Sequence, residues 1–259
     1  MSSLLYKRKN NYPLVVAHRG ASNYAPENTI ASFLLAWEVG ADAIEGDFHL
    51  TMDGHIVCIH DYDTKRICET NLVINNSTLE ELRKLDVGSH FNADYSDQRI
   101  PTIGQVFDIV PKGNKILVEV KCGIEILPVL IEQIKLSNLN LSQIIVISFA
   151  SEVIKECKLI EPKLVAIWLN HFNENSDIET IISTLVNIKA DGISSNSIIN
   201  DKLSSAVIDL GMSYHCGWNI EDLNVVNKLI NWGVKSITTN NPDKIKEHLI
   251  KVLGANKYD

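Results

Sequence analysis

Two acidic residues in one strand-like segment are the first candidates for chemistry. Glu45 and Asp47 lie in the largely apolar segment 43–50, with one residue between them. Because side chains alternate between the two faces of a strand, both carboxylates point to the same side of the sheet. Paired carboxylates on one face can bind a metal ion or take part in proton transfer.

A histidine is expected beside this pair. The dipeptide Asp53-Gly54 is a strong hairpin signal, and an apolar segment that ends at His60 follows it. A two-residue loop at these positions sets His60 opposite Asp47, and a neighbouring register still leaves the imidazole beside the carboxylates. Two acids and an imidazole gathered by local geometry outline a site for metal binding and proton transfer.

Polar residues also end two further apolar runs. One run ends in His18 and Arg19, and another carries Glu119 and Lys121 at its end. A single residue of this kind is most simply a solvated charge, but several at successive strand ends need another explanation. Glu119 and Lys121 share one face of their strand, where burial would cost several kcal/mol unless they were paired or bound to a metal. We expect them to contact one another or an ion.

The acidic residues form an all-oxygen ligand set. Glu45, Asp47 and Glu119 suit a hard divalent cation, Mg²⁺ or Ca²⁺, better than zinc. Zinc hydrolases built on barrels usually use a His-x-His pair, and none of the eight histidines has that spacing. The sequence therefore predicts one oxygen-ligated divalent cation.

The basic residues indicate phosphoryl chemistry. Arg19 offers a planar fork that can bind a phosphate with two hydrogen bonds, and Lys121 offers a second positive charge. His18 and His60 can supply an acid and a base near neutral pH. A cation with these groups would stabilise negative charge where it develops on a transferred phosphoryl group.

Alternating strand and helix signals must position these residues. A parallel sheet with outer helices follows from the alternation, and the repeats favour a closed TIM (β/α)8 barrel, with a doubly wound open sheet as the alternative. Residues 1–259 are expected to form a single domain, and residues 62–100 a small insertion after the second strand. The expected strands are 14–18, 43–50, 55–60, 116–121, 144–149, 164–169, 192–195, 213–218 and 236–239. The expected helices are 26–39, 78–85, 103–109, 125–136, 151–160, 177–188, 201–210, 222–232 and 242–253.

Composition narrows the class of protein. A formal net charge of −8 argues against nucleic acid as a partner. The five cysteines include no Cys-x-x-Cys motif, as is typical of reduced thiols in a cytoplasmic protein. The polar and basic segment 1–10 does not resemble a signal peptide, and the chain lacks the run of about eighteen apolar residues that a membrane span needs. We expect a soluble, cytoplasmic protein that acts on a small molecule.

A series of ordered motifs covers most of the chain. These are His18-Arg19-Gly20, Pro26-Glu27-Asn28-Thr29, Glu45-Gly46-Asp47, Thr51-Met52-Asp53-Gly54, His60-Asp61, Ile100-Pro101-Thr102 and Glu119-Val120-Lys121. In type and spacing they resemble the glycerophosphodiester phosphodiesterase family, in its small bacterial cytoplasmic form. The likeness runs from about Leu14 to Pro242, and its first two motifs are the most specific.

The resemblance implies a TIM barrel with an insertion after the second strand, one divalent cation, a histidine acid–base pair and two phosphate-binding cations. The matching positions are Glu45, Asp47 and Glu119 for the metal, His18 and His60 for acid and base, and Arg19 and Lys121 for the phosphate. Trp218 ends a late strand and is expected to close the pocket over the substrate. Of the other histidines, His171 is expected in a surface or loop position, and His215 is expected to face the helices.

The expected activity is metal-dependent hydrolysis of glycerophosphodiesters such as glycerophosphocholine or glycerophosphoethanolamine, in glycerol and lipid metabolism. The products would be sn-glycerol 3-phosphate and an alcohol. A lysophospholipase D- or phospholipase C-like enzyme is the alternative on the same barrel, and a non-catalytic phosphate-binding module is another. The sequence leaves open the acid and base assignment, the choice between a cyclic phosphate and direct attack by water, the preferred cation and head group, and whether the protein forms a homodimer.

Overall fold

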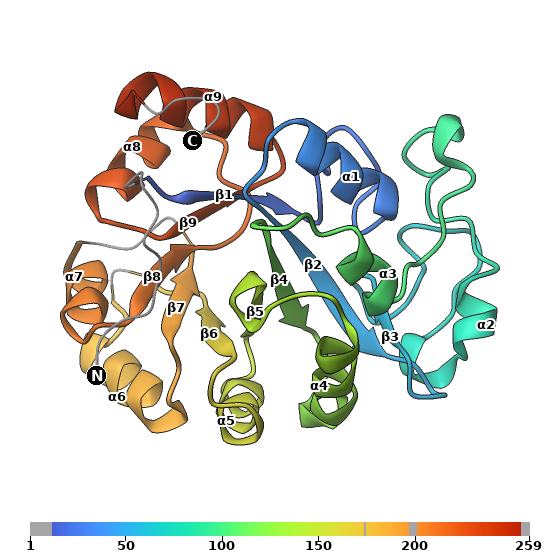
Figure 1. The fold of residues 1–259 in the computed structure, drawn as a ribbon, viewed down its shortest axis with the longest axis horizontal. Helices are drawn as coiled ribbons and strands as arrows, with labels where there is room; N and C mark the ends of the chain where they lie inside the picture. Colours follow the sequence, from blue (N-terminus) through green and yellow to red (C-terminus); the bar gives the residue numbers. More distant parts are fainter. Residues whose placement is uncertain (1–11, 174, 197–200, 255–259) are drawn as a thin grey trace.

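Within residues 12–173, 175–196 and 201–254, which the computed structural model describes, eight apolar segments form parallel strands that close into a barrel (Figure 1). The strands are β1 Leu14–His18, β2 Ala43–Leu50, β4 Lys115–Val120, β5 Ile144–Ser148, β6 Val165–Asn170, β7 Gly192–Ser195, β8 Ser213–Cys216 and β9 Ser236–Thr239. Strand β1 pairs with both β9 and β2, which closes the sheet and excludes the open alternative. The predicted TIM (β/α)8 barrel is confirmed.

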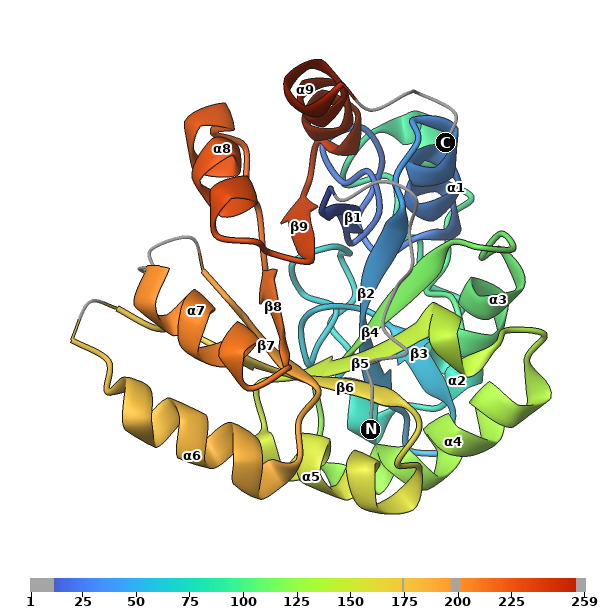
Figure 2. The same cartoon turned by 60° about the vertical axis from the view of Figure 1, so that its left-hand side comes forward.

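Helices follow the strands and lie on the outside of the barrel, as the turned view of Figure 2 shows for α6 to α9. They are α1 Ile30–Glu38, α3 Ile103–Asp108, α4 Leu127–Leu136, α5 Ser151–Ile160, α6 Ile178–Ile188, α7 Asp201–Asp209, α8 Leu223–Asn231 and α9 Pro242–Leu253. Short 3-10 turns are η1 Ile74–Asn76, η2 Ala93–Tyr95, η3 Ile124–Ile126 and η4 Leu141–Gln143. In the described residues, no helix is both long and apolar enough to cross a membrane.

Alternation along the strands divides the apolar side chains between two cores. One core lies between the sheet and the helices, and a smaller one fills the barrel interior. The interior core consists of Leu14, Val16, Ala43, Leu117, Ile145, Ile147, Ile167 and Leu169. Positions 45, 47 and 119 have the same parity as Ala43 and Leu117. The carboxylates therefore extend the interior rows toward the carboxyl ends of the strands.

The hairpin after β2 differs from its predicted register by one residue. Strand β3 Ile56–Cys58 is antiparallel to β2, with Leu50 opposite Ile56. A three-residue loop, 52–54, replaces the predicted two-residue loop, because Gly54 takes the left-handed φ of +80° that such a loop needs. The predicted pairing of His60 with Asp47 is wrong, since the backbone oxygen of Asp47 accepts instead from Ile59 at 2.9 Å.

The first helix begins later than predicted. Thr29 is the N-cap of α1, and its side chain accepts a hydrogen bond from the backbone nitrogen of Ser32. Residues 26–28, which were expected in the first turn, form a loop at the carboxyl end of β1. This correction matters for the site, because the loop carries Glu27 and Asn28.

Residues 62–100 pack beside β3, where they contribute to a separate apolar cluster. That cluster consists of Val57, Ile59, Ile67, Ile74, Leu82, Val87 and Ile100. The segment contains α2 Leu79–Leu82, capped by Thr78 and Glu81 as its sequence indicates. The start and end of the predicted 1–259 domain, including segment 1–10, lie outside the described residues.

The interior of β8 is polar. His215 is buried, with Nδ1 2.8 Å from the hydroxyl of Ser236 and Nε2 3.0 Å from that of Ser213. Its register partner Ser194 lines the pocket, so His215 points into the barrel, and the prediction that it faces the helices is wrong. The prediction counted alternate residues back from Trp218. Strand β8 ends at Cys216, so Trp218 lies outside the strand and does not indicate which face His215 occupies.

Candidate active site

A pocket of about 210 Å³ opens at the carboxyl ends of the barrel strands. Its polar lining is His18, Arg19, Glu45, His60, Glu119, Lys121, His171, Ser194 and Thr238, and the remainder is Leu117, Ile147, Phe149, Leu169, Gly217 and Trp218. Every predicted site residue except Asp47 lines this pocket, and Asp47 is buried in contact with two residues of the lining, Arg19 and Lys121.

Parallel strand register brings the acidic residues together. His18 of β1 is level with Glu45 of β2, and Asp47 is level with Glu119 of β4. Glu45, Asp47 and Glu119 each offer one oxygen, and these oxygens lie within 4.8 Å of one another. The three residues form a cluster that could hold a metal ion.

Two members of this cluster resist ionisation. Burial and repulsion from Asp47 raise the pKa of Glu45 well above its usual range and the pKa of Glu119 to about 7. Burial also opposes ionisation of Asp47, but Arg19 and Lys121 hold its pKa below the usual range. Oε1 of Glu45 is buried and has no hydrogen-bond partner. An orphaned buried oxygen beside two further carboxylates fits a cation with oxygen ligands.

Arg19 is fixed beside the cluster by its backbone and its guanidinium. It has a left-handed φ of +56°, and its backbone nitrogen donates to Oε2 of Glu45 at 3.0 Å. Its Nε lies 3.2 Å from Oδ2 of Asp47, and its Nη1 donates to Oε1 of Glu27 at 3.1 Å. The guanidinium is thereby held at the edge of the pocket with a fixed orientation.

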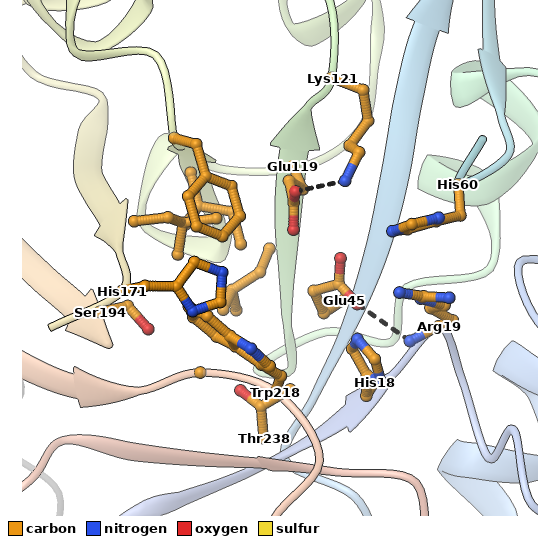
Figure 3. Close-up of a pocket in the computed structure, with 15 residues that line it drawn as sticks. His18, Arg19, Glu45, His60, Glu119, Lys121, His171, Ser194, Trp218 and Thr238 are labelled. Carbon is orange, nitrogen blue, oxygen red and sulfur yellow. Dashed lines mark hydrogen bonds and ion pairs between the residues drawn. The ribbon is translucent and has the colours of Figure 1, made fainter. Parts of the chain in front are cut away.

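Lys121 points toward Glu119, and His60 lies between Lys121 and Arg19 in the view of Figure 3. Its Nζ donates to Oε1 of Glu119 at 2.8 Å and lies 3.4 Å from Oδ1 of Asp47. As predicted, Glu119 and Lys121 contact one another.

His18 is held by a neutral amide. Its Nδ1 lies 2.7 Å from Oδ1 of Asn240, which follows β9 at the far end of the sequence. Because an amide oxygen only accepts, Nδ1 carries the hydrogen and Nε2 is left with a lone pair. Burial, helped by the charge of Arg19, lowers the pKa of His18 to about 4.

His60 is held by a carboxylate instead. Its Nδ1 lies 2.7 Å from Oδ1 of Asp61, and its backbone oxygen contacts Nε2 of His49 at 3.1 Å. The contact of Nδ1 with the Asp61 carboxylate orients the ring and leaves Nε2 as the nitrogen available to the pocket. The rings of His18 and His60 both lie on the Arg19 side of the carboxylates in Figure 3.

Aromatic rings form the opposite wall of the pocket. Trp218, at a left-handed φ of +48°, lies edge-on to His171 at 4.7 Å between ring centroids and to Phe149 at 5.4 Å. His171 also stacks on Phe149, with centroids 5.3 Å apart. The prediction that His171 is a surface or loop residue is confirmed, since it is exposed in the loop directly after β6, but in that loop it also joins this wall.

Sequence reasoning missed two further residues that hold the site in place. Asn28 donates from Nδ2 to Oδ2 of Asp47 at 2.8 Å and accepts from the Asp47 backbone at 3.2 Å. Asn240 orients His18. Asn28 belongs to the Pro-Glu-Asn-Thr motif, which is a usable signal, whereas no local pattern links Asn240 to His18.

Comparisons with known proteins agree with this arrangement. The model of the glycerophosphoryl diester phosphodiesterase family matches residues 18–244. A glycerophosphodiester phosphodiesterase of Caldanaerobacter subterraneus subsp. tengcongensis is 31% identical over 251 residues, covering 90% of this chain and 96% of the relative. Another, from Bacillus subtilis, is 28% identical over 249 residues, covering 89% and 84%.

A solved structure has the same fold. The phosphodiesterase of Oleispira antarctica, in complex with the product sn-glycerol 3-phosphate, superposes with a TM-score of 0.83. It is 25% identical and covers 92% of this chain and 97% of that chain. The chain therefore belongs to the glycerophosphoryl diester phosphodiesterase family and is an enzyme that cleaves glycerophosphodiesters.

Proposed function

We propose that the enzyme hydrolyses glycerophosphodiesters such as glycerophosphocholine or glycerophosphoethanolamine to sn-glycerol 3-phosphate and an alcohol, with one bound divalent cation. The observation that carries this proposal is the cluster of Glu45, Asp47 and Glu119, whose oxygens lie within 4.8 Å of one another and two of whose members line the pocket. The product complex of the Oleispira relative supports the choice of product.

The residues present fit a hard cation. Three carboxylates surround one point, and Oε1 of Glu45 has no other partner. Mg²⁺ and Ca²⁺ both prefer such oxygen ligands. When bound, the cation would polarise a phosphate oxygen and lower the pKa of the attacking hydroxyl.

Arg19 and Lys121 would bind the phosphate from two sides. Each already neutralises part of the acidic cluster, and each lines the pocket with a positively charged donor. The planar fork of Arg19 suits two oxygens of one phosphate, and Lys121 supplies a point charge. Trp218 would pack against the carbon atoms of the substrate on the opposite wall.

We propose His18 as the base and His60 as the acid. His18 has a neutral partner, Asn240, so the imidazole stays uncharged and its Nε2 can take the proton of the attacking hydroxyl. His60 has a carboxylate partner, Asp61, which holds the ring at Nδ1, so its Nε2 is placed to donate a proton to the departing alkoxide.

Two further expectations rest on the fold and composition. We propose that residues 62–100 act as a small subdomain of a single-domain enzyme, supported by their separate apolar cluster. We also propose a cytoplasmic enzyme, because all five cysteines are free thiols.

The test is release of glycerol 3-phosphate from glycerophosphocholine, followed with a coupled assay. Excess EDTA should abolish release, and added Mg²⁺ or Ca²⁺ should restore it. Undiminished turnover in excess EDTA would remove the metal from the proposal. Faster release of choline from lysophosphatidylcholine, which would leave lysophosphatidic acid and form no glycerol 3-phosphate, would instead support a lysophospholipase D-like activity.

A further inference from the structure

Arg66, from the insertion, binds two carboxylates at once. Its Nη1 and Nη2 donate to the two oxygens of Glu27 at 3.0 Å and 2.7 Å, and its Nε donates to Oδ2 of Asp61 at 2.6 Å. The contact with Glu27 is a two-point pairing with fixed geometry, which a planar guanidinium can form and an ammonium cannot.

Each of these carboxylates also holds a residue of the pocket. Oε1 of Glu27 accepts from Nη1 of Arg19 at 3.1 Å, and Oδ1 of Asp61 lies 2.7 Å from Nδ1 of His60. Arg66 itself is absent from the described residues that line the pocket. It therefore reaches Arg19 and His60 only through Glu27 and Asp61.

Arg66 connects two loops that are far apart in the sequence. Glu27 lies in the loop after β1, 39 positions before Arg66, whereas Asp61 follows β3. The phosphate-binding Arg19 belongs to the first of these segments, and His60 belongs to the second. The contacts of Arg66 with Glu27 and Asp61 therefore connect the segment of Arg19 to the segment of His60.

This contact is poorly suited to a role in global stability. The side chain of Arg66 is 45% exposed, and exposed ion pairs contribute little to the free energy of unfolding. What the contact does fix is the orientation of two side chains, and activity is sensitive to that.

We propose that Arg66 is a positioning residue of the reaction, which orients Arg19 through Glu27 and His60 through Asp61. The proposal rests on the phosphate-binding role of Arg19 and the acid role of His60 given above.

The test compares kinetic constants of Arg66→Met with those of Arg83→Met, an exposed arginine of the same insertion at the end of α2. Wild-type enzyme and His60→Ala are run alongside on glycerophosphocholine. We expect Arg66→Met to lower kcat/KM about 10- to 100-fold, with both a raised KM and a lowered kcat, and Arg83→Met to match the wild type. Loss of folded protein alone would scale the apparent kcat and leave KM unchanged, so a changed KM identifies positioning.

A double-mutant cycle tests the route of the effect. In the background Glu27→Gln with Asp61→Asn, the further change Arg66→Met should cost almost nothing, because its two partners no longer carry charge. Arg66→Lys should recover only part of the activity, since an ammonium cannot reproduce the two-point pairing. If Arg66→Met keeps the wild-type kcat and KM, or loses the same factor in the double background, the proposal is wrong. If His60→Ala remains active, the acid assignment fails instead, and the two failures are distinct.

Discussion

Replacing Asn240 with aspartate places a carboxylate where His18 now meets a neutral amide. The Nδ1 to Oδ1 distance is 2.7 Å, so the new carboxylate would accept a charge-assisted hydrogen bond from the imidazolium. Such bonds stabilise a charged partner by about 1–2 kcal/mol more than neutral ones, which corresponds to about one pKa unit. Asn240→Asp should therefore raise the pKa of His18 from about 4 by about one unit.

The direction of the change in activity depends on the role of His18. A base works only when unprotonated, so a higher pKa moves the acid limb of the kcat/KM profile to higher pH. Activity near pH 8 should change little. The assay is a pH profile of glycerol 3-phosphate release between about pH 4 and pH 9.

A matched variant tests the effect of charge alone. Asn219→Asp adds the same charge where Oδ1 now accepts from the Asn240 backbone at 3.1 Å, so its effect on the imidazole should be smaller. If Asn240→Asp leaves the acid limb unmoved and instead extends the alkaline limb, His18 acts in its protonated form. The proposed assignment of base and acid would then be reversed.

Three other perturbations probe separate parts of the account. His60→Ala should lower kcat by about 100-fold or more while the circular dichroism spectrum stays unchanged, and retention of most activity would remove His60 as the acid. Trp218→Ala should raise KM for glycerophosphocholine more than it lowers kcat, because packing on the aromatic wall acts mainly on binding; an unchanged KM would place the substrate elsewhere. Burial lowers the pKa of His215 to about 3, so below about pH 6 the unfolded chain binds one more proton than the folded chain. The free energy of unfolding therefore decreases as the pH is lowered, by on the order of 1 kcal/mol per pH unit. Urea unfolding at pH 7 and pH 5 should show this loss in the wild type and a smaller one in His215→Gln, and equal losses would contradict it.

The strand ends could be predicted because they depend on two local rules. Alternation fixed which side chains share a face, and the β/α repeat placed the ends of successive strands at one rim. Glu45, Asp47 and Glu119 followed from these rules, and the observed register brings them together as expected.

The hairpin register and the start of α1 could not be decided from sequence. Asp53-Gly54 fits both a two-residue loop and the end of a three-residue loop, and the choice depends on which residue adopts the left-handed φ. Pro26 suggested an early helix start, but the Thr29 capping box sets the actual one. At both places two local signals competed, and the sequence pattern alone does not rank one above the other.

Long-range partners were beyond the reach of pattern reasoning. Asn240 contacts His18 across 222 positions, and Arg66 contacts Glu27 across 39. Neither residue type has a spacing that predicts its partner. His171 was the exception that could have been found, because it directly follows a barrel strand, where active-site residues of this fold lie.

The central claim is that three carboxylates hold one ion, and calorimetric titration with Mg²⁺ or Ca²⁺ tests it most directly. Because the pKa of Glu119 is about 7 and that of Glu45 is raised, binding at pH 7 should release protons, and the heat should vary with the ionisation enthalpy of the buffer. The account predicts one ion per chain in the wild type and strongly weakened binding in both Glu45→Gln and Glu119→Gln. Equal binding by wild type and both variants, without proton release, would contradict it.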